Sequence, residues 1–195
     1  VARMASDVPL VPELAGHLIA AGGKRLRPLL TLAGARLAGG SPHAIGLATA
    51  VEFIHSATLL HDDVIDESKL RRGHDTANAL WGNDASVLVG DFLFARAFEL
   101  MVETDSLSVL GRLSNASARI TEGEIKQMTI AGVADTPAAD YLDVIRNKTA
   151  ILFAAAIAAG AEVAGAEKTV IEAIHDYGLQ LGMAFQIMDD AIDYS

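Results

Sequence analysis

Apolar residues recur at the three- and four-residue spacing of an amphipathic helix along almost the whole chain. No run alternates between apolar and polar residues for long enough to predict a half-buried strand. The pattern therefore predicts an all-α fold. Expected helices cover residues 10–20, 25–38, 42–67, 84–103, 106–130, 137–146, 148–164 and 167–194, with a short helical turn near 76–81.

Several residue pairs predict where these helices begin and end. Ser41-Pro42 and Thr136-Pro137 each join a preferred N-cap residue to a proline suited to the first helical position, so helices should begin there. Gly22-Gly23 and Gly39-Gly40 should end the helices before them. The segment around Ile151–Ala156 is apolar on every side, which predicts a helix enclosed by other helices.

Composition narrows the class of protein. A chain of 195 residues without a break in composition suits one domain, expected over residues 1–195. The longest charge-free apolar stretch, Thr149 to Ala161, is too short to cross a bilayer, and no secretory signal is visible, so we expect no transmembrane segment. The absence of cysteine fits a cytoplasmic location. The net charge of −10 argues against a nucleic-acid partner.

An acidic pattern, DDxxD, occurs twice, at residues 62–66 and 189–193, each time near the end of an expected helix. The first and last aspartates of each copy are four residues apart and so share a helical face. Carboxylate oxygen is the ligand type that Mg²⁺ prefers, together with water and substrate phosphate oxygens. A single aspartate is by default a solvated surface residue. With 15 aspartates in 195 residues, however, only about 0.09 copies of the motif are expected by chance.

Four sequence blocks resemble a known enzyme family. LLHDDVID at 59–66, followed after four residues by Arg71-Arg72-Gly73, resembles the first aspartate-rich motif of the trans-polyprenyl diphosphate synthases. GGKRLRP at 22–28 resembles the family's isopentenyl diphosphate motif, and FQIMDDAID at 185–193 resembles its second aspartate-rich motif. With Lys148-Thr149, the blocks follow the family's order over roughly residues 20–195.

The resemblance implies a large isoprenoid-synthase bundle of orthogonal and antiparallel helices around a central cavity, in a homodimer. It implies a prenyltransferase that adds isopentenyl diphosphate repeatedly, head to tail, to an allylic diphosphate such as farnesyl or geranylgeranyl diphosphate. Roughly three Mg²⁺ ions would bind with the substrate. The implied metal ligands are Asp62, Asp66 and Asp189, supported by Asp63, Asp190 and Asp193. Isopentenyl diphosphate would be bound by Lys24, Arg27, His55 and Arg72. The allylic diphosphate would be bound by Arg71, Lys148, Thr149 and Gln186. The catalytic set would be Asp62, Asp66, Arg71, Lys148 and Asp189.

Some of these residues have a plain structural interpretation as well. His55 lies seven residues before Asp62 and shares its face, but a hydrogen-bonded core histidine is a fair competitor. Lys148 would by default be a surface residue, and Gln186 a surface amide.

Two small residues suggest the length of the product. Thr58 and Ala57 lie four and five positions before Asp62, where short-chain members of the family carry bulky aromatic residues. The resemblance therefore implies an open tunnel and an octaprenyl- to decaprenyl-length product. Replacing Ala57 with Phe should shorten that product.

Three alternatives stay open at this point. A metal phosphohydrolase of the HD type would use His61-Asp62 with His55, but would leave the second DDxxD unexplained. A terpene cyclase shares the first motif but usually carries a different second one. A non-catalytic subunit of a heteromeric synthase would not need intact aspartates in both motifs. The sequence also stops at Ser195, before the family's closing helices, and begins without Met, so we expect a chain truncated at both ends.

Overall fold

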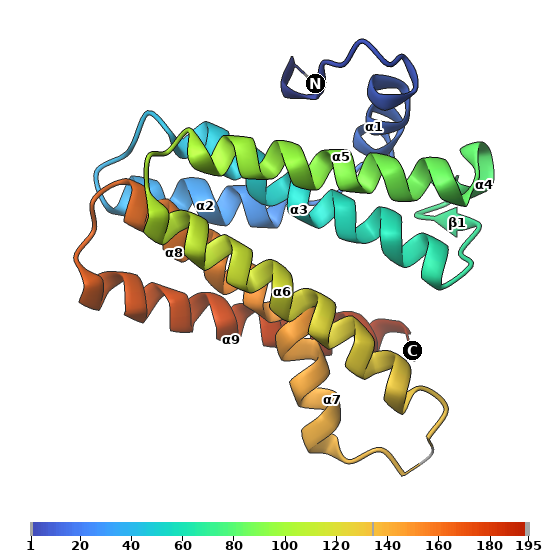
Figure 1. The fold of residues 1–195 in the computed structure, drawn as a ribbon. Helices are drawn as coiled ribbons and strands as arrows, with labels where there is room; N and C mark the ends of the chain where they lie inside the picture. Colours follow the sequence, from blue (N-terminus) through green and yellow to red (C-terminus); the bar gives the residue numbers. More distant parts are fainter. Residues whose placement is uncertain (1, 134, 194–195) are drawn as a thin grey trace. The chain divides into compact units, whose positions relative to one another are not determined.

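The computed structural model describes residues 2–133 and 135–193, and most of these residues lie in α-helices (Figure 1). The helices are α1 Leu10–Ala20, α2 Leu26–Leu37, α3 Ala44–Ile65, α4 Ala77–Trp81, α5 Asn83–Val102, α6 Leu107–Ile130, α7 Ala138–Ile145, α8 Ile151–Val163 and α9 Lys168–Asp193. The smaller elements are a 3₁₀ turn η1 (Ala2–Met4), strands β1 (Leu70–Arg71) and β2 (His74–Asp75), and a π-helical turn η2 (Arg146–Ala150). The all-α prediction is confirmed, and described helix ends agree with the expected ones to within three residues. Residue 194, the expected end of the last helix, lies outside the described residues.

The chain forms two compact units. One unit comprises Val1–Arg25 and Glu52–Leu100, and the other comprises Leu26–Val51 and Met101–Ser195. Helices α3 and α5 contribute residues to both. The expectation of a single domain stays a prediction.

Helix α8 is the centre of the second unit. Every residue from Leu152 to Ala161 is buried, and α8 packs against α2, α6 and α9. The prediction of an enclosed helix is therefore confirmed. Glycines let α2 and α8 approach closely: a Cβ atom at Gly160 would lie 2.0 Å from the carbonyl oxygen of Thr31, and one at Gly34 would lie 2.1 Å from that of Ile157. Only a residue without a side chain fits at these two points.

Replacing Gly160 with Ala is therefore expected to destabilise the protein by about 3 kcal/mol, since a buried methyl group would force two backbones apart. Urea unfolding followed by circular dichroism measures this change. The matched control is Gly111→Ala in α6, where nothing lies within 4 Å of the added Cβ. There the substitution should stabilise the helix by about 0.5–1 kcal/mol. Equal midpoints for the two variants would contradict the close approach of α2 and α8.

A tight hairpin, which the sequence analysis did not predict, follows α3 in the first unit. Leu70 pairs with Asp75 and Arg71 with His74, and the two-residue loop Arg72-Gly73 has φ values of 52° and 80°. Positive φ at both loop residues is typical of the type I′ turn that suits a two-residue hairpin. The strands are too short to show an alternating pattern, so sequence periodicity could not reveal them.

Both predicted Ser/Thr-Pro starts need correction. The helix expected from residue 42 begins at Ala44, because Ser41 Oγ accepts a hydrogen bond from the backbone N–H of His43 in a preceding turn. At the second site the N-cap is Pro137, while the Thr136 hydroxyl donates to the Val133 carbonyl, 2.7 Å away. In both places the hydroxyl makes a local turn contact instead of capping the helix.

Two helical segments are long and apolar enough to cross a membrane by length and composition: Ala44–Ile65 and the continuous stretch Ala138–Val163. In their most apolar windows, 50% and 83% of the residues are buried inside the protein. Core helices of a globular protein pass the same test, so these segments do not argue for membrane spans.

Candidate active site

The first acidic motif lies at the end of α3. The backbone N–H of Asp66 donates to the carbonyl of Asp62 over 2.8 Å, so the helical turn continues through the motif and places these two residues on one face. Glu67, with φ at 50°, then ends the turn. Asp62 is partly exposed and Asp66 is exposed, whereas Asp63 is only 1% exposed.

Asp63 is held by the hairpin. Arg71 donates to it twice from Nε, at 3.0 Å to Oδ1 and 3.2 Å to Oδ2, and once from Nη2, at 2.7 Å to Oδ1. Such a fork on a buried carboxylate is a strong, charge-assisted contact. Both oxygens of the middle aspartate thus already accept hydrogen bonds. The roles expected for Asp63 at Mg²⁺ and for Arg71 at the allylic diphosphate stay predictions.

The same hairpin carries Arg72 to the glycine loop after α1. Its guanidinium donates to the carbonyl oxygen of Gly22, and a Cβ atom at Gly23 would lie 2.8 Å from its Nη1. Gly23 has φ at 143°, so a side chain there would also strain the backbone. Arg72 therefore lies against the loop that continues into the exposed Lys24. The structure brings together two of the four residues expected to bind isopentenyl diphosphate.

The other two lie on different helices. His55 is partly buried on α3, in the first unit. Arg27, on α2 in the second unit, places its guanidinium 4.7 Å from the centre of the Phe153 ring, a cation–π contact.

The two residues expected to set product length differ in exposure. Ala57 is completely buried, whereas Thr58 keeps accessible surface and donates from Oγ1 to the His55 carbonyl, 2.8 Å away. A side chain can contact a bound hydrocarbon only where it has accessible surface. Of the two positions, Thr58 is therefore the better candidate, and the tunnel stays a prediction.

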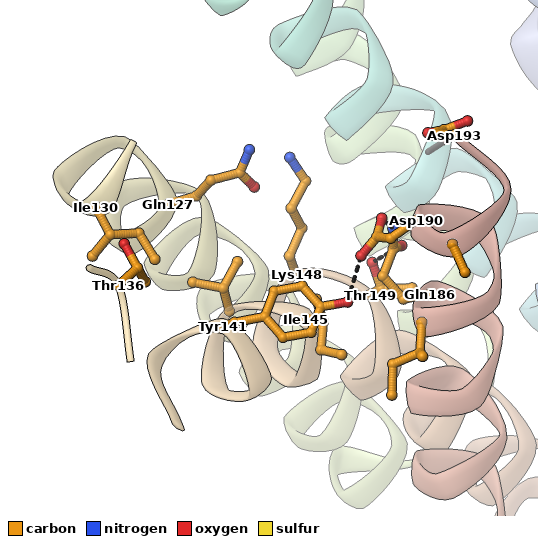
Figure 2. Close-up of a pocket in the computed structure, with 13 residues that line it drawn as sticks. Gln127, Ile130, Thr136, Tyr141, Ile145, Lys148, Thr149, Gln186, Asp190 and Asp193 are labelled. Atoms are coloured by element: carbon orange, nitrogen blue, oxygen red, sulfur yellow. Dashed lines mark hydrogen bonds between the residues drawn. The ribbon is translucent and has the colours of Figure 1, made fainter. Parts of the chain in front are cut away.

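The second acidic motif borders a cavity of about 750 Å³ in the second unit (Figure 2). The polar residues that line it are Gln127, Thr136, Tyr141, Lys148, Thr149, Gln186, Asp190 and Asp193. The apolar residues are Ile130, Val144, Ile145, Ile187 and Ala191. Three residues expected at the allylic diphosphate, Lys148, Thr149 and Gln186, thus share one cavity with two aspartates of the motif.

Lys148 and Thr149 lie in the π-helical turn η2, which contacts α6 and α9. Glycines allow both contacts: a Cβ at Gly123 of α6 would lie 2.8 Å from the backbone nitrogen of Lys148, and one at Gly182 of α9 would lie 2.5 Å from Cα of Ala150. Single π-helical turns are frequent at functional sites. Here the π-helical turn separates α7 from α8 and contains both residues of the Lys148-Thr149 block.

The side chains of Lys148 and Thr149 bind residues of the same two helices, α6 and α9. Lys148 Nζ donates to Glu124 Oε2 on α6 over 2.7 Å. Thr149 Oγ1 donates to Gln186 Oε1 on α9 over 2.8 Å. Close backbone packing therefore fixes where the ammonium and hydroxyl groups lie.

Asp190, the middle aspartate of the second motif, also has both oxygens engaged. Gln186 Nε2 donates to Oδ1 over 2.7 Å, and the Tyr141 hydroxyl donates to Oδ2 over 2.6 Å. Figure 2 shows the Tyr141 ring reaching across from α7 to Asp190. Asp189 is partly buried, and Asp193, the last residue of α9, is exposed.

Helix α7 is anchored to α6 by one lysine. Lys126 Nζ lies 2.9 Å from Asp140 Oδ1 and 2.8 Å from Asp143 Oδ2, two carboxylates that flank Tyr141 in sequence. These hydrogen bonds raise the pKa of Lys126, while the one from Lys126 lowers the pKa of Asp143. Both side chains are partly exposed, so solvent screening keeps the effect on stability small, but the contacts connect α7 to α6.

Among residues 2–133 and 135–193, no group of three or more His, Asp or Glu side chains is arranged to hold a metal ion by itself. The donor set nevertheless fits Mg²⁺, which usually takes one or two carboxylates and completes its shell with water and phosphate oxygens. The first and last aspartates of each motif offer two carboxylates on one face.

Sequence analysis missed Tyr141, Glu124 and Gln127. Each lies outside the recognised blocks, on a helix that meets the cavity only through tertiary packing. Tyr141 is seven residues before Lys148, a spacing compatible with one helical face, but nothing local distinguishes it from a surface tyrosine.

The comparisons with known proteins agree with the sequence blocks. The family model described as polyprenyl synthetase matches residues 8–195. The octaprenyl diphosphate synthases of Haemophilus influenzae and Escherichia coli are 49% and 46% identical over 100% and 99% of this chain. The chain spans 59% and 60% of the length of these two relatives.

Solved structures are similar as well. A decaprenyl diphosphate synthase from Rhodobacter capsulatus is 56% identical with a TM-score of 0.97, and the match covers 100% of this chain and 60% of that one. A polyprenyl synthase from Caulobacter crescentus, solved with calcium and isoprenyl diphosphate, is 59% identical with a TM-score of 0.96, over 99% of this chain and 59% of that one. This chain therefore belongs to the polyprenyl synthetase family.

Proposed function

We propose that the protein containing this chain is a Mg²⁺-dependent prenyltransferase that adds isopentenyl diphosphate head to tail, in repeated cycles, to an allylic diphosphate. The observation that carries the proposal is the cavity of the second unit. Its wall combines an ammonium group, a hydroxyl and an amide with carboxylates of the second acidic motif. A diphosphate with bound Mg²⁺ needs both kinds of partner: donors for its oxygens and carboxylates for its metal.

The names of the relatives support a long product. The curated relatives cited above make octaprenyl diphosphate, and the most similar structures cited above are a decaprenyl diphosphate synthase and a polyprenyl synthase. We therefore propose an all-trans product of octaprenyl to decaprenyl length, started from farnesyl or geranylgeranyl diphosphate. Neither a phosphohydrolase nor a non-catalytic subunit is supported by these relatives.

The donors that the structure describes retain capacity for a ligand. An ammonium group carries three protons, so Lys148 can keep its contact with Glu124 and still donate to a phosphate oxygen. The Gln186 amide carries a second N–H besides the one on Asp190. Arg71 uses Nε and Nη2 on Asp63, which leaves further guanidinium protons for a diphosphate.

Mg²⁺ ions would be held by the outer aspartates of each motif, Asp62 and Asp66 in the first and Asp189 and Asp193 in the second. Bound Mg²⁺ would neutralise the charge that develops on the leaving diphosphate. The residues of the chain bind and orient the two diphosphates, and the apolar side of the cavity, with Ile145 and Ile187, limits the access of water. Homodimerisation and a cytoplasmic location stay predictions.

The test is condensation of radiolabelled isopentenyl diphosphate with farnesyl diphosphate and Mg²⁺ by the full-length natural protein. Label should enter chain-elongated polyprenyl diphosphate, and removal of Mg²⁺ with EDTA should abolish this, because the carboxylates alone repel a diphosphate. Release of phosphate without elongation would indicate a phosphohydrolase. If no label enters a longer polyprenyl diphosphate, either with the protein alone or with a partner protein added, the proposal is refuted.

A further inference from the structure

We infer that Tyr141 is a positioning residue of the proposed allylic-diphosphate site, and that it acts by holding the carboxylate of Asp190 in place. The inference rests on the proposed function, since it concerns the same cavity. It assigns a role to a residue that none of the four sequence blocks contains.

The hydrogen bonds around Asp190 all have the same direction. Thr149 donates to the Gln186 oxygen, and the Gln186 nitrogen donates to Asp190 Oδ1 over 2.7 Å. Tyr141 donates to Oδ2 from the opposite side over 2.6 Å. The chain of donors thus runs from both sides toward one carboxylate. An ionised carboxylate only accepts, so Asp190 sets the orientation of every other member.

The amide orientation of Gln186 follows from this arrangement. Its nitrogen must face Asp190 and its oxygen Thr149, because the reverse would place the amide oxygen against a carboxylate oxygen, and both of these only accept hydrogen bonds. Tyr141 holds the far oxygen and so prevents the carboxylate from rotating away. Without that hydroxyl, the side chains of Asp190, Gln186 and Thr149 are no longer held in one hydrogen-bonded arrangement.

The backbone of Tyr141 is itself well fixed. Lys126 binds Asp140, the residue before Tyr141, and Asp143, two residues after it. Asn147, in the turn that follows, donates to the carbonyl and the side chain of Asp143. Tyr141 can therefore connect α7 to α9 from a defined position.

The first acidic motif holds its middle aspartate in a similar way. Its middle residue, Asp63, accepts a fork of hydrogen bonds from Arg71, just as Asp190 accepts from Tyr141 and Gln186. In both motifs these charge-assisted hydrogen bonds hold the middle carboxylate in a fixed orientation beside the outer aspartates.

The experiment compares Tyr141→Phe with wild type in the full-length natural protein. The probe is a farnesyl thiodiphosphate, an unreactive allylic analogue, titrated by calorimetry at saturating Mg²⁺. Loss of one hydrogen bond to a charged group should weaken its binding about tenfold or more. In the steady-state assay, KM for the allylic substrate should rise while kcat stays close to the wild-type value, as expected for an interaction lost equally in the ground and transition states. The matched control is Tyr177→Phe, an exposed tyrosine on α9, which should leave both values unchanged.

A second variant guards against a simple folding defect. Asp190→Asn keeps the shape of the side chain and should weaken the analogue to a similar extent, while the double variant with Tyr141→Phe should be no worse than the poorer single one. Additive losses in the double variant would overturn the inference.

The outcomes distinguish failure of the positioning role from failure of the proposed function. If wild type elongates farnesyl diphosphate but Tyr141→Phe binds the analogue as tightly as wild type, the positioning role is refuted and the function stands. If wild type fails to elongate any allylic diphosphate, the proposed function falls, and this inference falls with it.

Discussion

Replacing Asp189 with Asn is expected to lower kcat for isopentenyl diphosphate condensation by about 10³-fold, with the fold retained. An amide keeps the shape of the side chain but removes the charge that binds Mg²⁺, and loss of one preorganised electrostatic contact at developing charge costs about 10²–10³-fold. Asp189 is partly buried, so solvent replaces the lost charge poorly. Initial rates with radiolabelled isopentenyl diphosphate over a range of Mg²⁺ concentrations measure the effect.

The control for this variant lies on the same helix. Asp176 is on α9, its side chain is 82% exposed, and its Oδ1 lies 3.6 Å from Nδ1 of His175. Asp176→Asn should keep wild-type rates. Asp62→Asn, in the first motif, should match the loss at Asp189, because the proposal gives the outer aspartates of both motifs the same task. Activity near the wild-type level in either Asp189→Asn or Asp62→Asn would contradict the metal assignment.

Replacing Thr58 with Phe is expected to shorten the polyprenyl product by several isoprene units. The residue follows His55 on α3 by one turn and keeps accessible surface, so an aromatic ring there would narrow the space proposed for the growing chain. The position expected from the sequence, Ala57, has no accessible surface. A phenyl group at Ala57 would first overpack the core, at a cost of about 1–3 kcal/mol. Thin-layer chromatography of the dephosphorylated products measures chain length.

Thr49→Phe is the matched control for this experiment. Thr49 is on the same helix, is also partly buried, and its Oγ1 likewise donates to a preceding carbonyl, that of Ile45. It lies nine residues before Thr58, which places it on the opposite face of the helix. Its product should keep the wild-type length. A product of unchanged length from Thr58→Phe, at normal turnover, would exclude this residue from the tunnel.

Local sequence determined the helices well because each one carries its own periodic apolar face. The ends were less accurate where a hydroxyl had two possible partners. Ser41 and Thr136 both make a turn contact instead of capping a helix, and the backbone conformation of the folded chain determines which of these contacts forms. The hairpin at 70–75 and the π-helical turn at 146–150 left no periodic signal, because strands of two residues and a turn of five are too short for an apolar pattern to repeat.

The chemistry divides in the same way. The sequence alone supplied the four blocks, because spacing along a helix places Asp62 with Asp66, and Asp189 with Asp193, before any packing is known. It could not assign the middle aspartates, whose partners come from other elements: Arg71 from the hairpin, and Tyr141 from α7. Likewise, only tertiary packing showed that Lys148 meets Glu124 through the close approach at Gly123. Periodicity reports which residues of one helix share a face, whereas contacts between helices depend on how closely their backbones approach, which is a property of the folded chain.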